Sequence, residues 1–278
     1  MKILRTVDEL RQWSRTAKKD GVVGLVPTMG ALHEGHASLI RRAAGECGHV
    51  VVSVFVNPTQ FGPNEDFDRY PRTFEADCLL AEAAGAEAVF APAVEALYPR
   101  GASTFVDVEG LNSRLDGASR PGHFKGVATV VSKLFLAAEP DRAYFGQKDA
   151  AQVSVLRRMV RDLLLGVDLV VCPIVREDDG LALSSRNRYL KDEERAAALV
   201  LSHAVRTVEE LFRGGEREAT KLNAAALTVF ATESDVRIDY IELVDWETLL
   251  PVAQAAPGNL FAVAAWVGET RLIDNSVL

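Results

Sequence analysis

The stretch from Val22 to His36 constrains the fold most, because an apolar run breaks there into a glycine-bracketed turn that carries His33 and His36. Val22–Val26 is rich in the β-branched residues of a buried strand, and Pro27 ends the hydrogen-bonded ladder. Apolar residues at helical spacing follow His36. The stretch predicts a strand, a loop and a helix whose first-turn amides face outward and suit a phosphate.

The two histidines, three residues apart, have three interpretations. They could cap and pack the helix. They could bind zinc, although zinc needs a third ligand and neither a nearby cysteine pair nor the H-E-x-x-H spacing is present. They could also donate hydrogen bonds to the phosphate oxygens of a nucleotide. The spacing leaves all three open.

Length and charge narrow the class of protein. A chain of 278 residues with 48% hydrophobic residues indicates one large domain or two unequal ones with a proper core. The formal net charge is −8 and no lysine-arginine run is present, so no nucleic acid or membrane partner is expected. Any anionic ligand must therefore be bound by a local cluster of positive or hydrogen-bond-donating groups.

The three cysteines, Cys47, Cys78 and Cys172, are scattered and odd in number. They give no disulfide framework, and they fit small core residues in a reducing compartment.

Residues 1–19 have no long apolar run, so we expect no signal peptide, and no segment is apolar enough to span a bilayer. The expected location is the cytoplasm.

Strand-like runs alternate with helical segments through the first two thirds of the chain, which predicts an α/β, Rossmann-like parallel sheet flanked by helices. Its polar turns should meet at the carboxyl ends of the strands. Further strands are expected at His49–Val56, Ala88–Phe90, Thr104–Val108, Arg142–Phe145 and Val167–Val171, and helices at Thr73–Ala84, Phe124–Leu136 and Ala150–Leu164.

The pattern changes at Asp192, where a long helical stretch begins and is interrupted at Gly214-Gly215. Two extended runs, Val236–Val244 and Leu260–Val267, follow it. We expect a smaller C-terminal α+β domain over residues 178–278, behind a nucleotide- and substrate-binding domain over residues 1–177.

Taken together, the polar turns resemble those of the pantothenate synthetase (pantoate–β-alanine ligase) family over essentially the whole chain. The histidine motif alone indicates only the wider nucleotidylyltransferase superfamily. The Asn-Pro-x-Gln-Phe and Ser-Ser-Arg-Asn elements narrow the resemblance to this family. The matching stretches are Pro27–His36 (PTMGALHEGH), Phe55–Phe61 (FVNPTQF), Tyr70–Thr73 (YPRT), Phe145–Gln152 (FGQKDAAQ) and Asp179–Leu190 (DGLALSSRNRYL).

This resemblance implies an enzyme that condenses pantoate with β-alanine at the expense of ATP, through a pantoyl adenylate, and releases AMP and pyrophosphate. It also implies Mg²⁺ and a homodimer. The implied catalytic residues are His36, to which the family assigns an acid role, with His33, Lys148 and Arg186. The implied nucleotide-binding residues are Met29, Gly30, Ala31, Leu32, His33, Glu34, Gly35, His36, Gly146, Gln147, Lys148, Asp149, Val175, Leu183, Ser184, Ser185 and Arg186.

The resemblance also implies a substrate-binding set and one metal ligand. Gln60 and Gln152 match the glutamines that bind pantoate, with Gln60 also near the β-alanine position. Asp77 falls where relatives have an acidic residue near the metal, although its surroundings are not distinctive. The remaining implied substrate contacts are Pro27, Thr28, Met29 and Asn57.

Residue chemistry supports this interpretation separately. Lys148, Arg186 and the histidines suit the negative charge that grows on phosphate oxygens when a carboxylate attacks the α-phosphorus. A neutral glutamine orients that carboxylate with less loss of nucleophilicity than an arginine would cause. A related cytidylyltransferase would keep the histidines without the glutamines, and an RNA-binding module would need a basic face. Singly, each of these polar residues could be a solvated side chain or a helix cap.

Overall fold

The structure is a computed structural model that describes residues 1–63 and 65–278. Its contacts divide the chain into two compact units. The first contains Met1–Gly146 and Val155–Cys172, and the second contains Gln147–Ser154 and Pro173–Leu278. The chain thus enters the second unit twice. The domain boundary expected after residue 177 stays a prediction, and the sequence gave no sign of the first entry.

The first unit contains a six-stranded parallel sheet in the order β1-β4-β3-β2-β5-β6, which confirms the predicted Rossmann-like α/β class. From β2 the sheet continues to β3 and β4 on one side and to β5 and β6 on the other. The loop after β2 therefore leaves the sheet where ligands bind in open α/β folds. The strands are β1 (Lys2–Leu4), β2 (Val23–Thr28), β3 (His49–Val54), β4 (Ala88–Phe90), β5 (Arg142–Gly146) and β6 (Asp168–Cys172).

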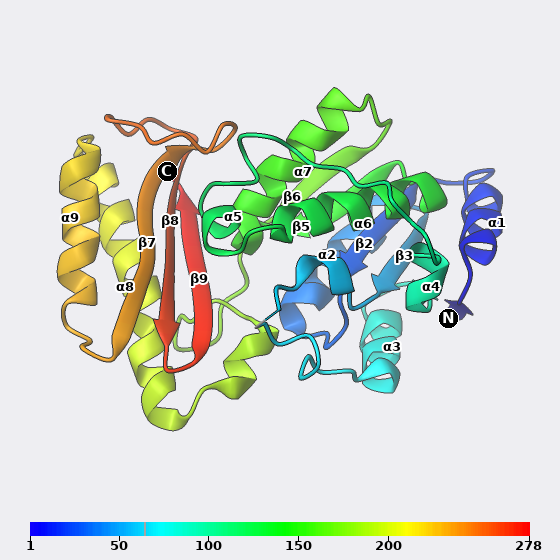
Figure 1. Ribbon diagram of the computed structural model, residues 1–278, viewed down its shortest axis with the longest axis horizontal. Coiled ribbons are helices and arrows are strands. Elements are labelled where there is room, and N and C mark those ends of the chain that lie inside the picture. The colour runs from blue at the N-terminus through cyan, green and yellow to red at the C-terminus, as the bar shows by residue number, and fades with distance from the viewer. Residues whose placement is uncertain (64) are drawn as a thin grey trace. The chain divides into compact units, whose positions relative to one another are not determined.

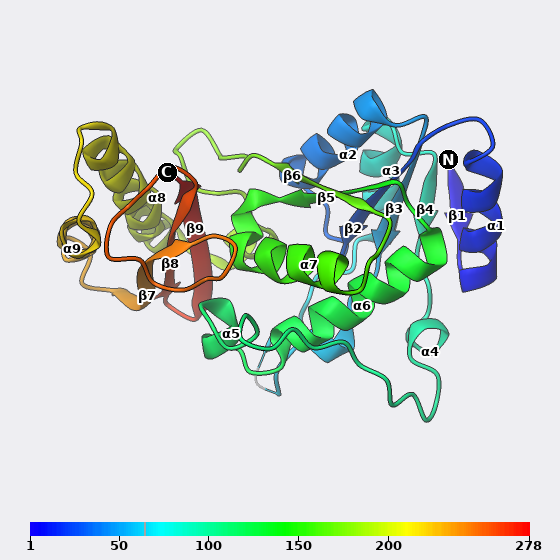
Figure 2. The same cartoon turned by 90° about the horizontal axis from the view of Figure 1, so that it is seen from above.

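Helices cover both faces of this sheet, which explains why β2 and β3 are almost continuously apolar. Figure 2 shows α2 and α3 on one face, with α6 and α7 on the other. The helices are α1 (Val7–Ala17), α2 (Glu34–Glu46), α3 (Phe74–Ala83), α4 (Val94–Leu97), α5 (Asp116–Ser119), α6 (His123–Ala138) and α7 (Ala150–Asp162), with a 3-10 turn η1 at Pro58–Gln60.

The strand expected at Thr104–Val108 is wrong, because that segment contains no strand. The backbone N–H of Val106 donates to Oγ1 of Thr129 on α6 at 2.9 Å, so a side chain takes the place of a ladder partner. The prediction also missed β1 and α1. The latter begins with a capping box between Thr6 and Glu9.

The second unit contains the predicted α+β arrangement, with two helices and an antiparallel sheet in the order β7-β8-β9 (Figure 1). Its elements are α8 (Asp192–Arg213), α9 (Ala219–Phe230), β7 (Val236–Asp245), β8 (Asn259–Val267) and β9 (Thr270–Val277), with 3-10 turns η2 (Gln147–Asp149) and η3 (Ser185–Tyr189). The sequence did not predict β9.

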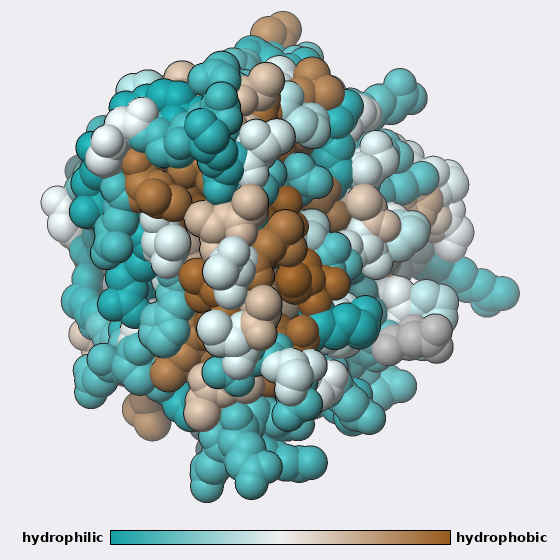
Figure 3. Space-filling view, turned by 90° about the vertical axis from the view of Figure 1, so that its left-hand side faces the viewer, coloured by the Kyte–Doolittle hydropathy of each residue, from teal (hydrophilic) through white to brown (hydrophobic). Residues whose placement is uncertain are grey.

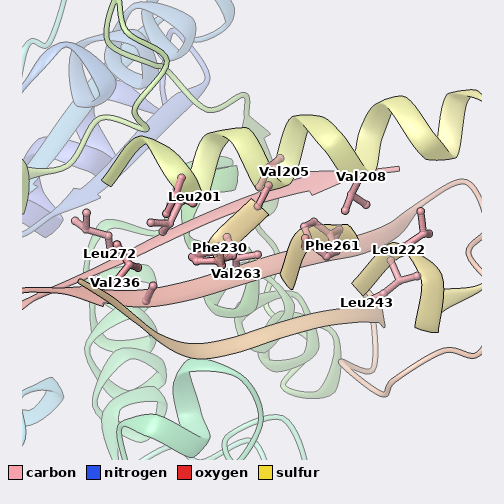
Figure 4. Packing of buried hydrophobic residues seen from close by; sticks show 14 of the residues in the cluster. Leu201, Val205, Val208, Leu222, Phe230, Val236, Leu243, Phe261, Val263 and Leu272 are labelled. Carbon is pink, nitrogen blue, oxygen red and sulfur yellow. The ribbon is translucent and has the colours of Figure 1, made fainter. Parts of the chain in front are cut away.

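One apolar core holds the second unit together. Figure 4 shows Leu201 and Val205 of α8 and Leu222 and Phe230 of α9 in the same cluster as Phe261 of β8. Figure 3 shows apolar side chains on the surface, gathered in a band between hydrophilic ones.

Within residues 1–63 and 65–278, every helix is too short or too polar to cross a membrane.

A surface ion cluster lies at the amino end of β3. His49 contacts Glu87 through Nδ1 at 2.8 Å and Asp20 through Nε2 at 3.5 Å. The hydrogen bond to Glu87 raises the pKa of His49 above its ordinary value of 6.5, against a smaller opposing effect of burial. The cluster therefore stabilises the fold when His49 is protonated.

We expect this stabilisation to be complete below pH 6.5 and to disappear as the pH rises through the higher pKa of the folded state. The imidazole is only 22% exposed but its partners are largely solvated, so the contribution should stay below about 1 kcal/mol. Urea unfolding of the wild type and of His49→Gln at several pH values measures it. An equal difference between the two proteins at pH 5.5 and pH 8.5 would contradict the assignment.

Candidate active site

The loop after β2 has a strained backbone held by buried side chains. Thr28 Oγ1 donates to the carbonyl of Ser53 at 2.6 Å and accepts from the N–H of Gly30 at 3.2 Å. Gly30 has φ of 83° and Ala31 has φ of 50°, so two consecutive residues are left-handed. For Ala31 this costs roughly 1–2 kcal/mol, which the surrounding contacts must offset.

Asp77 on α3 supplies those contacts. Its carboxylate accepts from the N–H of Ala31 at 3.0 Å, from the N–H of Leu32 at 2.8 Å and from Thr73 Oγ1 at 3.0 Å. The residue is 2% exposed. Residues 1–63 and 65–278 contain no group of three His, Cys, Asp or Glu side chains that could hold a metal. The structure thus places Asp77 beneath the loop, as a hydrogen-bond acceptor for the backbone.

The two histidines lie where this loop enters α2. Nδ1 of His33 accepts from the N–H of Gly35 at 3.1 Å, and Nδ1 of His36 accepts from the N–H of His33 at 3.3 Å. A ring nitrogen that accepts has no proton, so each imidazole carries its proton on Nε2. Their ring centroids are 4.1 Å apart. The two rings therefore cap the helix through one nitrogen and carry a hydrogen-bond donor on the other.

Gln60 is held with a defined amide orientation. Oδ1 of Asn57 accepts from the N–H of Thr59 at 3.4 Å, and its Nδ2 donates to the carbonyl of Gly126 at 3.1 Å, which fixes the Asn57 amide so that Nδ2 donates to Oε1 of Gln60 at 3.0 Å. This leaves Nε2 of Gln60 on the side of Met29, whose sulfur lies 3.0 Å away. Asn57 and Gln60 are 1% and 8% exposed. The loop thus carries a buried amide with its N–H groups oriented.

A second network fixes the backbone of Gln60. His123 contacts the Gln60 carbonyl through Nδ1 at 2.8 Å, and its Nε2 lies 3.0 Å from Nη1 of Arg120. Burial and the guanidinium of Arg120 lower the pKa of His123 to about 4, so the ring is neutral at physiological pH. Its Nδ1–H donates to the carbonyl and its Nε2 accepts from Arg120. Arg120 also forms a two-pronged ion pair with Glu65, at 2.8 and 2.7 Å.

In the second unit, β9 organises the residues implied for the nucleotide. Nδ2 of Asn275 donates to the carbonyls of Gln147 and Lys148, at 3.1 and 2.8 Å. Nε2 of Gln147 donates back to Oδ1 of Asn275 at 3.3 Å. Nζ of Lys148 lies 3.7 Å from Oδ1 of Asp149. The Asn275 side chain thus fixes the backbone of Gln147 and Lys148.

The loop from Val175 to Arg186 is fixed in the same unit. Arg176 makes an ion pair with the buried Asp274 at 2.6 and 3.0 Å. The N–H of Leu183 donates to the carbonyl of Val175 at 2.9 Å. Ser184 Oγ accepts from the N–H of Arg186 at 3.2 Å and begins η3. The sequence predicted Ser184 and Arg186 as site residues, but it gave no sign that Asp274 holds Arg176 or that Asn275 holds the backbone of Gln147 and Lys148.

The structure therefore brings the implied residues together in two groups. In the first unit, Gln60 contacts both Asn57 and Met29, and Met29 belongs to the loop after β2. In the second, the segment Gln147–Asp149 and η3 both contact β9, and Gln152 lies on the first turn of α7, half-buried. Tyr98 was not predicted as a site residue, because its contact with Asn57 joins residues 41 positions apart.

A six-stranded parallel sheet with helices on both faces is typical of the Rossmann-like α/β class, in which ligands bind at the carboxyl ends of the strands. Comparison with known proteins identifies the particular family. The family model described as pantoate-beta-alanine ligase matches residues 2–277. The chain therefore belongs to the pantoate–β-alanine ligase family.

Individual relatives agree with this assignment. The pantothenate synthetase of Acidobacterium capsulatum is 64% identical over 92% of this chain and 86% of its own length. That of Thermotoga neapolitana is 55% identical over the full length of both chains.

Solved structures have the same fold. Pantothenate synthetase from Thermus thermophilus superposes with a TM-score of 0.95 at 48% identity, covering 100% of this chain and 99% of that one. Pantoate-beta-alanine ligase from Francisella tularensis, solved in complex with beta-gamma ATP and beta-alanine, has a TM-score of 0.77 at 31% identity, with 100% and 97% covered.

Proposed function

We propose that this ligase forms pantothenate in two steps through a pantoyl adenylate. In the first, a carboxylate oxygen of pantoate bonds to the α-phosphorus of ATP as the bond to the β-phosphate oxygen breaks, and pyrophosphate leaves. In the second, the amine of β-alanine attacks the acyl carbon, AMP departs with the shared oxygen, and the amine loses a proton. The buried amide of Gln60 is the observation that supports this scheme best.

Gln60 suits a carboxylate nucleophile because it is neutral. Its Oε1 accepts a hydrogen bond from Asn57 and its Nε2 donates to the sulfur of Met29, so the second N–H of Nε2 is the group that would orient an acid. A buried guanidinium would bind the carboxylate more tightly in the ground state and lower its reactivity, whereas an amide orients it at smaller cost. A cytidylyltransferase has no need for such a group, and the family assignment does not support that alternative.

The nucleotide side of the proposal depends on donors and positive charge. The Nε2–H groups of His33 and His36 can donate to phosphate oxygens on which charge develops, and the first turn of α2 supports them. Lys148 and Arg186 would add cations in the second unit. The Francisella tularensis ligase was solved in complex with beta-gamma ATP and beta-alanine, which fits a site for both substrates in this chain.

Magnesium remains a prediction, and Asp77 does not fit the role of its ligand. Mg²⁺ keeps near-octahedral oxygen coordination and is commonly held by substrate phosphates with one or two carboxylates. Both oxygens of Asp77 already accept hydrogen bonds in the protein interior. No step of the proposed mechanism therefore depends on a metal bound by this residue. The homodimer, the cytoplasmic location and the absence of nucleic acid or membrane partners also stay predictions.

The order of the steps has a direct test. With pantoate present and β-alanine absent, the protein should exchange labelled pyrophosphate into ATP, because the first step is complete and reversible without the amine. A parallel reaction without pantoate gives the background. Exchange that strictly required β-alanine would contradict an adenylate formed before the amine reacts.

A further inference from the structure

The carboxylate of Asp77 spans two consecutive backbone amides in the loop that leads to the histidines. One oxygen accepts from Ala31 and the other from Leu32, at 3.0 and 2.8 Å. Successive amides beside left-handed residues form a concave anion-binding site in many phosphate-binding loops. In this protein a side chain from α3 occupies that concavity, so those two amides are already satisfied by an internal anion.

The loop is built for this close approach. A Cβ atom on Gly30 would lie 3.0 Å from Oδ2 of Asp77, so a side chain there would press on the carboxylate. Thr73 Oγ1 donates to the other oxygen and fixes the carboxylate on its own helix. Leu32 directly precedes His33, the N-cap of α2. The position of the Leu32 amide therefore sets where the capping histidine begins.

We infer that Asp77 is a positioning residue that holds the left-handed loop and so orients the imidazoles of His33 and His36. It acts through the backbone, and it binds neither the nucleotide nor a metal. Two observations support this role. The carboxylate of Asp77 accepts hydrogen bonds from two adjacent backbone amides, and the residue is only 2% exposed. A metal ligand would need neither feature. Only its catalytic consequence rests on the proposed function.

Hydrogen exchange without substrates tests the contact itself. In Asp77→Asn the amide group can accept from Leu32, but its NH₂ opposes the N–H of Ala31. The amides of Ala31 and Leu32 should then exchange at least about tenfold faster than in the wild type. Glu75→Gln is the matched control, since Glu75 is an exposed carboxylate in the same first turn of α3. Equal exchange in Asp77→Asn and in the wild type would overturn the inference.

Pyrophosphate exchange separates positioning from metal binding. Asp77→Asn should lower the maximal rate while the magnesium concentration for half-maximal rate stays unchanged. A tenfold rise in that concentration would show a metal ligand and overturn the inference. If the wild type itself shows no exchange with pantoate, the proposed function fails, and the amide measurement still decides the role of Asp77.

A second pair of variants covers the case in which Asp77→Asn does not fold. Thr73→Val keeps the carboxylate and removes one of its three hydrogen bonds, whereas Thr73→Ser keeps the hydroxyl. Faster exchange of the Ala31 and Leu32 amides in Thr73→Val, with wild-type exchange in Thr73→Ser, supports the inference. Wild-type exchange in both variants would count against it.

Discussion

His36→Ala is expected to lower turnover by about two to four powers of ten. Nδ1 of His36 accepts a hydrogen bond from the N–H of His33, so the ring carries its proton on Nε2. This N–H can donate to a phosphate oxygen on which negative charge develops. Alanine removes this donor at the helix start, so the loss should fall on turnover more than on pantoate binding. Single-turnover formation of the adenylate and the pantoate dissociation constant measure the two effects separately.

Two further variants sharpen this test. His36→Gln retains an N–H donor on a side chain of similar length and should recover part of the loss. His203→Ala removes an exposed histidine from α8 and should leave turnover unchanged. Near-normal turnover in His36→Ala would show that the ring only caps the helix.

Gly126→Ala is expected to lower the catalytic efficiency for pantoate by about a hundredfold and to destabilise the fold by about 1–3 kcal/mol. A Cβ at this position in α6 would lie 2.3 Å from the carbonyl oxygen of Thr59 and 2.7 Å from Cα of Gln60. Both are backbone atoms that no rotamer change can move. The added methyl group must therefore displace η1 and the amide that it carries.

The expected loss of stability is opposite in sign to the effect of replacing an ordinary helical glycine by alanine. Alanine in place of glycine normally favours a helix by about 1 kcal/mol. Gly45→Ala in α2 is the matched control, because its added Cβ meets nothing within 4 Å. It should keep wild-type activity and gain slightly in stability. Thermal unfolding and steady-state kinetics on both variants test the prediction, and wild-type efficiency in Gly126→Ala would refute it.

Local sequence was enough to predict the frame around the site. The β-branched run in Val22–Val26, the glycines of the turn and the helical spacing after His36 indicated a strand, a loop and a helix, which the structure contains as β2 and α2. The same reasoning indicated the parallel sheet and the C-terminal α+β unit. These features depend on residues close to one another in the chain, so their periodicity is visible in the sequence.

The precise placement of the functional groups was decided by contacts between distant residues. Asp77 meets the N–H of Leu32 across 45 positions, and Asn275 meets the carbonyl of Lys148 across 127. No strand forms at Thr104–Val108, where a hydroxyl on α6 accepts from the backbone N–H of Val106. A hydrogen bond between distant residues imposes no spacing on either segment, so only the folded chain shows which carboxylate lies under which amide.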